Sequence, residues 1–246
     1  MERKVSGVGD LISVIRAEKE QSNGTMWYRG QANSEWELLP GLLRGVRNIS
    51  EATLLSRFKQ SAAMLTDSRP TSSFDWVFLM QHYGVPTRLL DWSENPLVAL
   101  YFAVCDHGSH PDVDAALWFL LPSALNKNAN IIDKSEGDYI PSFDDQEVLG
   151  YSTESVRNAS RLELFPIATI ATRNNPRIQA QMGTFTVHHN KSISIESVGD
   201  GKHARKIIIP KDAKADILSE LSLLGVNRFS LFPEMESIGN ILKEMM

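Results

Sequence analysis

Apolar residues recur every three or four positions in several parts of the chain, which predicts amphipathic helices. The clearest pattern is SEATLLSRFKQSAAML, for which Ser50 supplies an N-cap. Similar spacing predicts a helix after Asp10, with Asp10 as its N-cap, and another over KADILSELSLLG, ended by Gly225. A further helix is predicted from Ser73 to Gly84.

Short runs rich in β-branched and aromatic residues predict strands in TMWYRGQ, DAALWFLLP, LFPIATIAT, GTFTVHH and RKIIIP. Pro86 forces an extended path, so VPTRLLDW is loop or strand, and SENPLVALYFAVCDH then resumes as a helix with Ser93 as its cap. The tail from Val226 predicts a strand and a final helix. Helices that do not alternate regularly with strands favour an α+β fold, with a mixed or antiparallel sheet flanked by helices. Without a linker or an internal repeat, residues 1–246 are expected to form one domain.

The region 126–160 departs from both patterns because it is polar and aperiodic. This composition predicts a long surface excursion that contains short helical pieces. Long ordered loops in compact domains often serve as lids or binding loops, so we expect a surface loop or lid here.

The amino-acid composition limits the classes of protein and of binding partner that this chain fits. Hydrophobic residues make up 42% of the chain and charged residues 22%, as in ordinary globular proteins. The net charge of -5 argues against broad electrostatic capture of nucleic acid, although it is compatible with a local basic patch. Cys105 lies in the apolar run LVALYFAVC, which predicts a buried thiol without a disulfide or a catalytic role. No signal peptide or membrane span is evident, so a cytoplasmic protein without a membrane partner is expected.

The first polar motif is WYRGQ, which should place Arg29 and Gln31 at the end of a buried strand. A guanidinium there can hold a carboxylate or a phosphate with two parallel hydrogen bonds. Gly30 would let a ligand approach the backbone closely. The alternative is a structural arginine that pairs with Asp91 or Glu35.

The second motif, HYGVPTRLLDWSENP, is denser in polar residues than a core element requires. Its candidate residues are His82, Tyr83, Arg88, Asp91, Trp92 and Ser93. His82 would act as an acid or base near neutral pH, or as a structural hydrogen-bond donor. Trp92 would stack on a planar base or belong to the core. Tyr101, on the following helix, would point back toward the same cleft.

The third motif, RIQAQMGTF, carries Arg177, Gln179 and Gln181 at alternate positions, which a strand would place on one face. Glutamines cannot act as general bases, but their amides can orient a ligand. The nearest acidic candidates in the sequence are Glu94, Glu147 and Glu163.

Several mechanisms lack their sequence signatures. The chain has no P-loop, no GxGxxG, no HExxH, no paired CxxC and no GxSxG. His107 and His110 stand near Asp112 and Asp114, a set that is compatible with a metal ion. Such a cluster in a Gly/Pro turn is usually a solvated loop, so we expect no metal.

The combination of WYRGQ, LMQHYGVPTRLLDWSENPLVALYFA, RIQAQMGTF and LLGVNRFSLFPEME resembles the FRG domain family, over nearly the whole chain. Tyr28 replaces the phenylalanine that is usual in the family. A weaker similarity links three of these regions to ADP-ribosyltransferases, in which the first motif holds NAD, the second lines the nicotinamide pocket and the third supplies a catalytic glutamate. This resemblance implies a split sheet.

Carried over to this chain, that similarity implies that Arg29 contacts the NAD pyrophosphate or ribose. Ser93 and Tyr101 would line the nicotinamide pocket, and Gln181 would occupy the place of the glutamate. A carboxylate stabilises positive charge on the ribose, whereas an amide only donates or accepts hydrogen bonds. Either Glu94 or Asp91 substitutes, or the domain binds without this chemistry.

Three hypotheses follow. The first is an NAD-utilising ADP-ribosyltransferase-like domain, such as a toxin or phage-defence effector, that uses NAD as substrate and nucleic acid or protein as acceptor. The second is a non-catalytic module that recognises a nucleotide or a nucleic-acid end through Arg29, Arg88 and Arg177, with Trp92 stacking. In the third, the motif residues mainly support the fold, with Arg88 and Asp91 as a buried pair.

Overall fold

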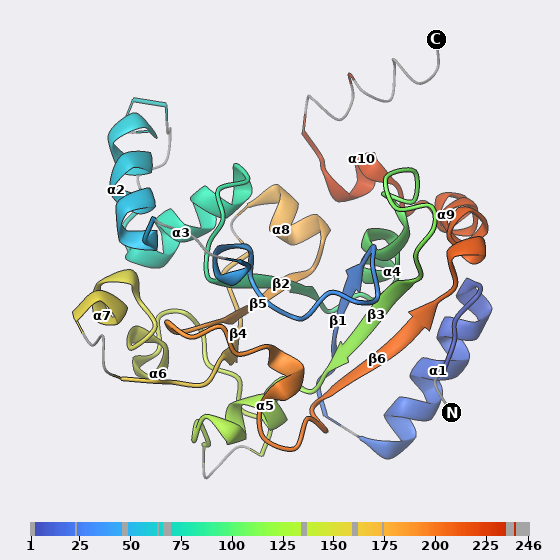
Figure 1. Cartoon of the computed structure of the whole chain (residues 1–246), viewed down its shortest axis with the longest axis horizontal. Helices are drawn as coiled ribbons and strands as arrows, with labels where there is room; N and C mark the ends of the chain where they lie inside the picture. Colours follow the sequence, from blue (N-terminus) through green and yellow to red (C-terminus); the bar gives the residue numbers. More distant parts are fainter. Residues whose placement is uncertain are drawn as a thin grey trace.

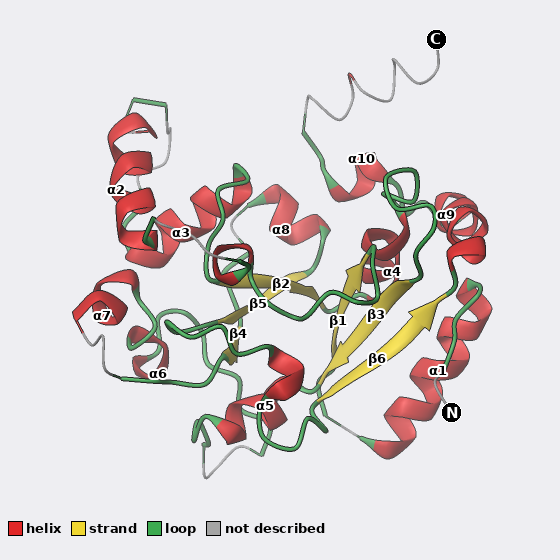
Figure 2. Cartoon of the chain, viewed as in Figure 1, coloured by secondary structure: helices red, strands yellow, loops and turns green. Residues whose placement is uncertain are grey.

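The computed structural model describes residues 3–22, 24–45, 49–62, 64–65, 70–133, 137–158, 162–173, 175–234 and 239. Within these ranges the chain folds into one antiparallel sheet with helices packed around it (Figure 1; Figure 2). The α+β fold class predicted from the sequence is confirmed.

The described residues form six strands, and each of the five runs TMWYRGQ, DAALWFLLP, LFPIATIAT, GTFTVHH and RKIIIP overlaps one of them. They are β1 (Trp27–Gln31), β2 (Leu89–Ser93), β3 (Ala115–Leu120), β4 (Ile167–Thr169), β5 (Gly183–Val187) and β6 (Ala204–Ile209). Their order in the sheet is β4-β5-β2-β1-β3-β6. The segment after Pro86, predicted as loop or strand, therefore contributes β2 to the middle of the sheet.

The helices are α1 (Val8–Gln21), α2 (Glu51–Ala62), α3 (Ser73–His82), α4 (Pro96–Val104), α5 (Pro122–Asn128), α6 (Gln146–Leu149), α7 (Thr153–Asn158), α8 (Pro176–Ala180), α9 (Lys214–Leu223) and α10 (Arg228–Leu231). Short 3-10 turns cover Gly41–Leu43, Ile195–Ser197 and Lys211–Ala213. The Ser50 hydroxyl accepts the Thr53 N–H at 3.2 Å, which confirms Ser50 as the N-cap of α2. Gly225, with φ +78°, follows α9 in the left-handed conformation that ends many helices.

Two predicted helix caps are wrong. Asp10 lies inside the first turn of α1, where its carboxylate accepts the Ser6 N–H at 2.9 Å. Ser93 belongs to β2, and Asn95 caps α4 instead, by accepting the Leu97 N–H at 2.9 Å. The N-cap of α1 is Gly7, which makes no side-chain cap hydrogen bond, whereas at α4 the cap lies two residues after the predicted one.

Two strand predictions are also wrong. The residues RIQAQ form α8 and its C-cap, because Asn175 caps the helix and Pro176 occupies its first position. The side chains of Arg177, Gln179 and Gln181 therefore do not share one face of a strand. The tail contains α10 where a strand was predicted, and its predicted final helix falls, apart from residue 239, outside the described residues.

The region 126–160 does contain short helices, α6 and α7, but it is not simply a surface excursion. Val148 and Tyr151 are buried in the core. Asn126 is also buried, and its amide makes two hydrogen bonds to the backbone of Ala168, at 2.7 and 3.0 Å. The Asn126 amide thereby satisfies the N–H and C=O groups of Ala168 in β4, as a neighbouring strand would. Residues 134–136 and 159–160 lie outside the described part, and a lid role stays a prediction.

Cys105 is exposed, contrary to the prediction of a buried thiol. It follows the last residue of α4 and does not lie on the buried face of that helix. In the part of the chain that the structure describes, no helix is both long enough and apolar enough to cross a membrane.

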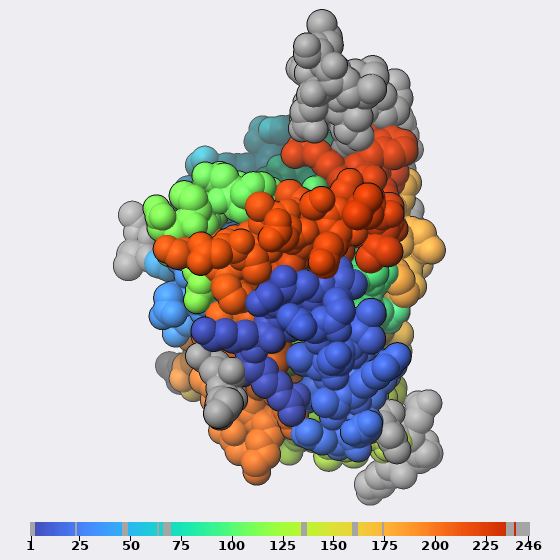
Figure 3. Space-filling model, turned by 90° about the vertical axis from the view of Figure 1, so that its right-hand side faces the viewer, coloured from blue at the N-terminus to red at the C-terminus, as the bar shows by residue number. Residues whose placement is uncertain are grey.

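Alternate residues of the central strands face two different buried clusters. Tyr28, Leu117 and Phe119 face α1, α4 and α9, while Trp27, Trp92 and Trp118 point to the opposite side of the sheet. A third cluster packs α3 and α6 against β2, β4 and β5. Figure 3 shows α1 beside α9 on one face of the molecule.

The sheet opens between β1 and β2. These two strands share the single register pair Tyr28 and Ser93, whereas β1 pairs with β3, and β2 with β5, along five positions each. Figure 1 shows the two resulting groups of strands running in clearly different directions. Beyond the shared pair, the ends of β1 and β2 diverge.

Candidate functional site

A cleft of about 730 Å³ lies where β1 and β2 diverge. Small-molecule sites in proteins typically enclose about 300–1,000 Å³. Most of the residues singled out in the sequence line this cleft: Arg29, Gln31, His82, Asp91, Trp92, Ser93, Arg177 and Gln181. Tyr83, Arg88 and Tyr101 do not line it.

Arg29 reaches from β1 across the opening to β2. Its Nη1 donates to the backbone carbonyl of Asp91 at 2.7 Å, and its Nε is buried without a hydrogen-bond partner among the described residues. Burial lowers the pKa of Arg29 to about 10, an effect that Asp91 opposes and Arg44 reinforces. The predicted ion pairs of Arg29 with Asp91 or Glu35 do not form, since the contact to Asp91 is made to its backbone.

Gly30 lines the cleft, and its lack of a side chain also serves packing, a role that the sequence interpretation did not include. A Cβ atom at this position would lie 2.0 Å from the Ala99 carbonyl oxygen and 2.4 Å from the Ala103 nitrogen. The absence of a side chain therefore lets the backbone of α4 press against β1. This contact fixes α4 beside the cleft.

Asp91 presents an exposed carboxylate from β2 to the cleft. Its Oδ1 accepts a hydrogen bond from Gln81 Nε2 at 2.9 Å, and the Thr87 hydroxyl donates to Gln81 Oε1. The Leu89 N–H in turn donates to the Thr87 hydroxyl oxygen at 3.1 Å. This chain of hydrogen bonds holds the Asp91 side chain in one orientation.

Ser93 and Gln181 meet at the start of β5. The Ser93 hydroxyl donates to the Gln181 carbonyl at 2.7 Å and accepts the Asn95 N–H at 3.0 Å. The Gln181 side chain points to α10, where its Nε2 donates to the Leu231 carbonyl at 3.0 Å. The second and third motifs are thus joined directly.

His82 ends α3 at the wall of the cleft. Its Nε2 lies 3.7 Å from Glu234 Oε1, and its carbonyl accepts a long hydrogen bond from Arg177 at 3.4 Å. Burial lowers the pKa of His82; Glu234 opposes this shift and Arg177 adds to it. The Arg177 guanidinium also stacks over Phe232 at 4.5 Å. Phe232 and Glu234, which follow α10, therefore pack on the cleft wall.

Gln31 and Trp92 line the cleft but are engaged in the fold. The Gln31 amide accepts from the Trp118 indole at 2.7 Å and donates to the Glu37 carbonyl at 3.2 Å. The Trp92 indole is buried and donates to the Thr186 hydroxyl at 3.0 Å. Neither side chain is arranged to stack on a ligand or to reach one without a rearrangement.

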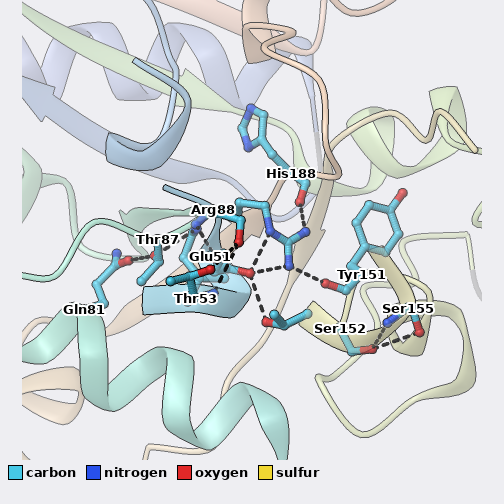
Figure 4. A network of polar contacts seen from close by, with 12 residues as sticks. Glu51, Thr53, Gln81, Thr87, Arg88, Tyr151, Ser152, Ser155 and His188 are labelled. Carbon is cyan, nitrogen blue, oxygen red and sulfur yellow. Dashed lines mark hydrogen bonds and ion pairs between the residues drawn. The ribbon is translucent and has the colours of Figure 1, made fainter. Parts of the chain in front are cut away.

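Arg88 is a structural residue in the core. Figure 4 shows its guanidinium between Glu51 and the carbonyl groups of Tyr151 and His188. The Glu51 carboxylate is 2.7 Å from Arg88 Nη2 and also accepts the Thr153 hydroxyl at 2.9 Å. The predicted pairing of Arg88 with Asp91 is therefore wrong, as is its expected place in a ligand cleft.

Tyr101 and Tyr83 also lie elsewhere than expected. Tyr101 is buried in the cluster beneath α4, and its neighbour Phe102 lines the cleft instead. Tyr83 is exposed directly after α3, with its ring next to Phe58.

The other acidic candidates are not in the cleft. Glu94 pairs with Arg173, Glu163 pairs with Lys191, and Glu147 is exposed on α6. Within the described ranges, no group of three or more His, Cys, Asp or Glu side chains is arranged to hold a metal ion.

The sequence interpretation missed several residues that line the cleft: Trp36, Arg44, Asp75, Phe78, Gln81, Phe102 and Asp106. Gln81 directly precedes the second motif and lies in the run LMQHYG, where it could have been found. Arg44 comes from an irregular segment after β1, where no periodic pattern marks it.

The comparisons agree with the first two motifs. A family model described as FRG domain matches residues 24–112, so this part of the chain is similar to the FRG domain family, as the resemblance implied. The match is shorter than the nearly complete span we expected, since RIQAQMGTF and LLGVNRFSLFPEME lie beyond it. The comparisons with curated proteins and with solved structures gave no match.

Proposed function

We propose that this protein binds NAD in the cleft between β1 and β2 and acts as an NAD-utilising ADP-ribosyltransferase-like enzyme. One observation carries the proposal: the three motif regions of the resemblance meet at the opening of the sheet. Arg29 comes from β1, Ser93 from β2, and Gln181 directly precedes β5. The Ser93–Gln181 hydrogen bond and the Arg29–Asp91 hydrogen bond connect these regions.

Arg29 is suited to the pyrophosphate or a ribose hydroxyl of NAD. It has a positive charge in a partly enclosed site and a buried Nε without a partner in the described chain. A buried donor that lacks a partner is costly, and a ligand oxygen would satisfy it.

Asp91 is the carboxylate that we assign to the reaction, in place of the glutamate that the third motif lacks. Nicotinamide leaves NAD when its bond to the ribose breaks, and water or an acceptor group then bonds to the ribose carbon and loses one proton. A fixed carboxylate stabilises positive charge on the ribose and can accept that proton. Gln81 keeps Asp91 turned toward the cleft. Water, a nucleic acid or a protein could be the acceptor, and a toxin or phage-defence effector would use such an activity.

Nicotinamide release tests this proposal. The wild-type protein is incubated with NAD, alone and with nucleic acid or cell lysate, beside Arg29→Ala and Asp91→Asn variants whose folding is checked by thermal unfolding. We expect release by the wild type and a loss of at least about 100-fold in Asp91→Asn, on the scale of one lost electrostatic group. Wild-type release that Asp91→Asn retains would exclude this role for Asp91, and no release under any condition would refute the enzymatic proposal.

A non-catalytic module that binds a nucleotide or a nucleic-acid end is the second candidate. Gln181 favours it, because an amide stands where the resemblance has a glutamate and is already hydrogen-bonded to Leu231. This candidate predicts that NAD or a nucleotide binds equally well to the wild type and to Asp91→Asn, without turnover.

A further inference from the structure

Trp36 is an open aromatic side chain at the cleft. It lines the cleft and remains 38% exposed, whereas Trp27, Trp92 and Trp118 of the sheet are buried. An aromatic ring that stays open in a partly enclosed cleft offers a planar apolar surface of the kind on which nucleotide bases stack. Trp92, for which the sequence predicted this role, does not offer such a surface because its ring packs in the core.

The Trp36 ring is held in place by its neighbours. It meets the ring of His110 edge to face, with the centroids 5.3 Å apart and the planes at 90°. The buried Lys214 donates through Nζ to the carbonyls of Ala32 and His110, at 2.9 and 3.0 Å, and so joins the two segments that carry these rings. The Trp36 N–H also donates to the Asn33 carbonyl at 3.3 Å. A ring fixed in this way loses little conformational freedom when a ligand stacks on it.

A carboxylate stands beside this pair of rings. Asp106 lines the cleft with an exposed side chain, and its Oδ2 lies 3.9 Å from His110 Nε2. A base that stacks on Trp36 therefore has a hydrogen-bond acceptor near its edge. The exocyclic amine of adenine suits an acceptor, whereas a carbonyl in the same place does not.

The order of residues along β1 separates the Trp36 ring from the proposed reaction centre. Arg29 donates to the Asp91 carbonyl on β2. Gln31, two residues further along β1, donates at 3.2 Å to the carbonyl of Glu37, the residue after Trp36. Two residues of a strand span about 7 Å. A dinucleotide has a base at each end and phosphates between them, so with one base at the reaction centre the other comes to the Trp36 end of the cleft.

We propose that Trp36 stacks on the adenine ring of NAD and that Asp106 accepts a hydrogen bond from the exocyclic amine of that ring. The inference rests on the proposed function, which places the ribose that loses nicotinamide at Asp91. It makes the Trp36 end of the cleft the part that selects the adenine base. A mononucleotide with the same base uses the same ring.

Calorimetric titration of the full chain tests the stacking role, with NAD, AMP and nicotinamide mononucleotide, which lacks the adenosine, as probes. The variants are Trp36→Ala, Trp36→Phe and, as a control, Trp76→Ala, which removes a half-buried tryptophan of α3 outside the cleft. Loss of stacking on one base predicts that Trp36→Ala binds NAD and AMP about 5- to 100-fold more weakly than the wild type. Trp36→Phe should stay closer to the wild type because it keeps an aromatic face, and nicotinamide mononucleotide should bind all four proteins alike.

A second comparison tests the contact of Asp106. IMP carries a carbonyl where AMP carries the amine, so the wild type should bind AMP about tenfold more tightly than IMP. Asp106→Ala should reduce that preference because the acceptor is gone. Equal affinity of the wild type for AMP and IMP would overturn the assignment of Asp106.

The other outcomes separate the stacking role from the proposed function. Equal affinity of Trp36→Ala and Trp76→Ala for NAD and AMP would overturn the role of Trp36, even if the wild type releases nicotinamide. An equal loss for nicotinamide mononucleotide would also overturn it, because Trp36 would then shape the whole cleft. AMP binding that depends on Trp36, without nicotinamide release, would support the adenine site while refuting the enzymatic proposal. If Trp36→Ala does not fold, Trp36→Leu takes its place, and Trp36→Leu binding AMP as tightly as Trp36→Phe would overturn the stacking role.

Discussion

The buried pair of Arg88 and Glu51 allows a sharp prediction about stability. Their side chains are each 5% exposed, and the guanidinium also donates to the carbonyls of His188 and Tyr151 at 2.7 and 2.9 Å. These bonds tie α2 and the segment before α7 to the strands. Arg88→Met would leave a buried carboxylate without its counter-charge.

The expected cost follows from that arrangement. Removal of one partner of a buried ion pair typically costs about 3–5 kcal/mol, because the other charge remains desolvated. The Thr153 hydroxyl and the Arg88 backbone N–H would still reach Glu51, at 2.9 and 3.1 Å, so the lower half of that range is more reasonable. With an m value of about 2–3 kcal/mol/M, a loss of about 3 kcal/mol lowers the urea midpoint by roughly 1–1.5 M.

Urea unfolding followed by circular dichroism measures this change. A double variant, Arg88→Met with Glu51→Leu, supplies the control, since removal of both charges should restore most of the lost stability. A fall of less than about 1 kcal/mol in Arg88→Met would refute the structural role that we assign to Arg88.

Three further predictions concern the cleft and its surroundings. Gly30→Ala should destabilise the protein by about 3 kcal/mol or more in thermal unfolding, because its Cβ would lie 2.0 Å from the Ala99 carbonyl oxygen. A variant as stable as the wild type would contradict the close contact between β1 and α4. Gln81→Ala should lower kcat for nicotinamide release about tenfold with little change in KM, because Asp91 loses its orienting hydrogen bond; a change in KM alone would argue against this positioning role. Burial lowers the pKa of His188 to about 3. The unfolded chain therefore binds one proton more than the folded chain between about pH 6.5 and pH 3, and the free energy of unfolding should fall by up to about 1.4 kcal/mol per pH unit on acidification. His188→Leu should remove that share of the slope in urea unfolding at several pH values, and an unchanged slope would contradict it.

The strands could be predicted because their signals are local. WYRGQ and DAALWFLLP are short, aromatic or β-branched, and bounded by polar or turn residues, and both form central strands. The helical residues RIQAQ were missed although Asn175 and Pro176 carry a start signal, because alternate polar residues suggested a strand. The N-cap of α4 shows the same limit of prediction. Serine and asparagine both suit an N-cap position, so the sequence could not decide between Ser93 and Asn95.

The candidate site could be predicted only where a motif concentrates its residues. Arg29, Asp91 and Gln181 lie in motifs, and the cleft brings them together. Arg44 lies outside every motif, and only the fold shows that its side chain lines the cleft. The partner of Arg88 is 37 residues away, so composition and spacing could not distinguish a buried pair from a ligand contact.

The central claim is that the opening between β1 and β2 is a nucleotide site, and titration of NAD into the wild type and Arg29→Ala tests it most directly. We predict saturable binding to the wild type with one NAD per chain, weakened at least about tenfold in the folded variant, because a charge-assisted contact is lost. The absence of NAD binding, or equal affinity of the two proteins, would contradict it.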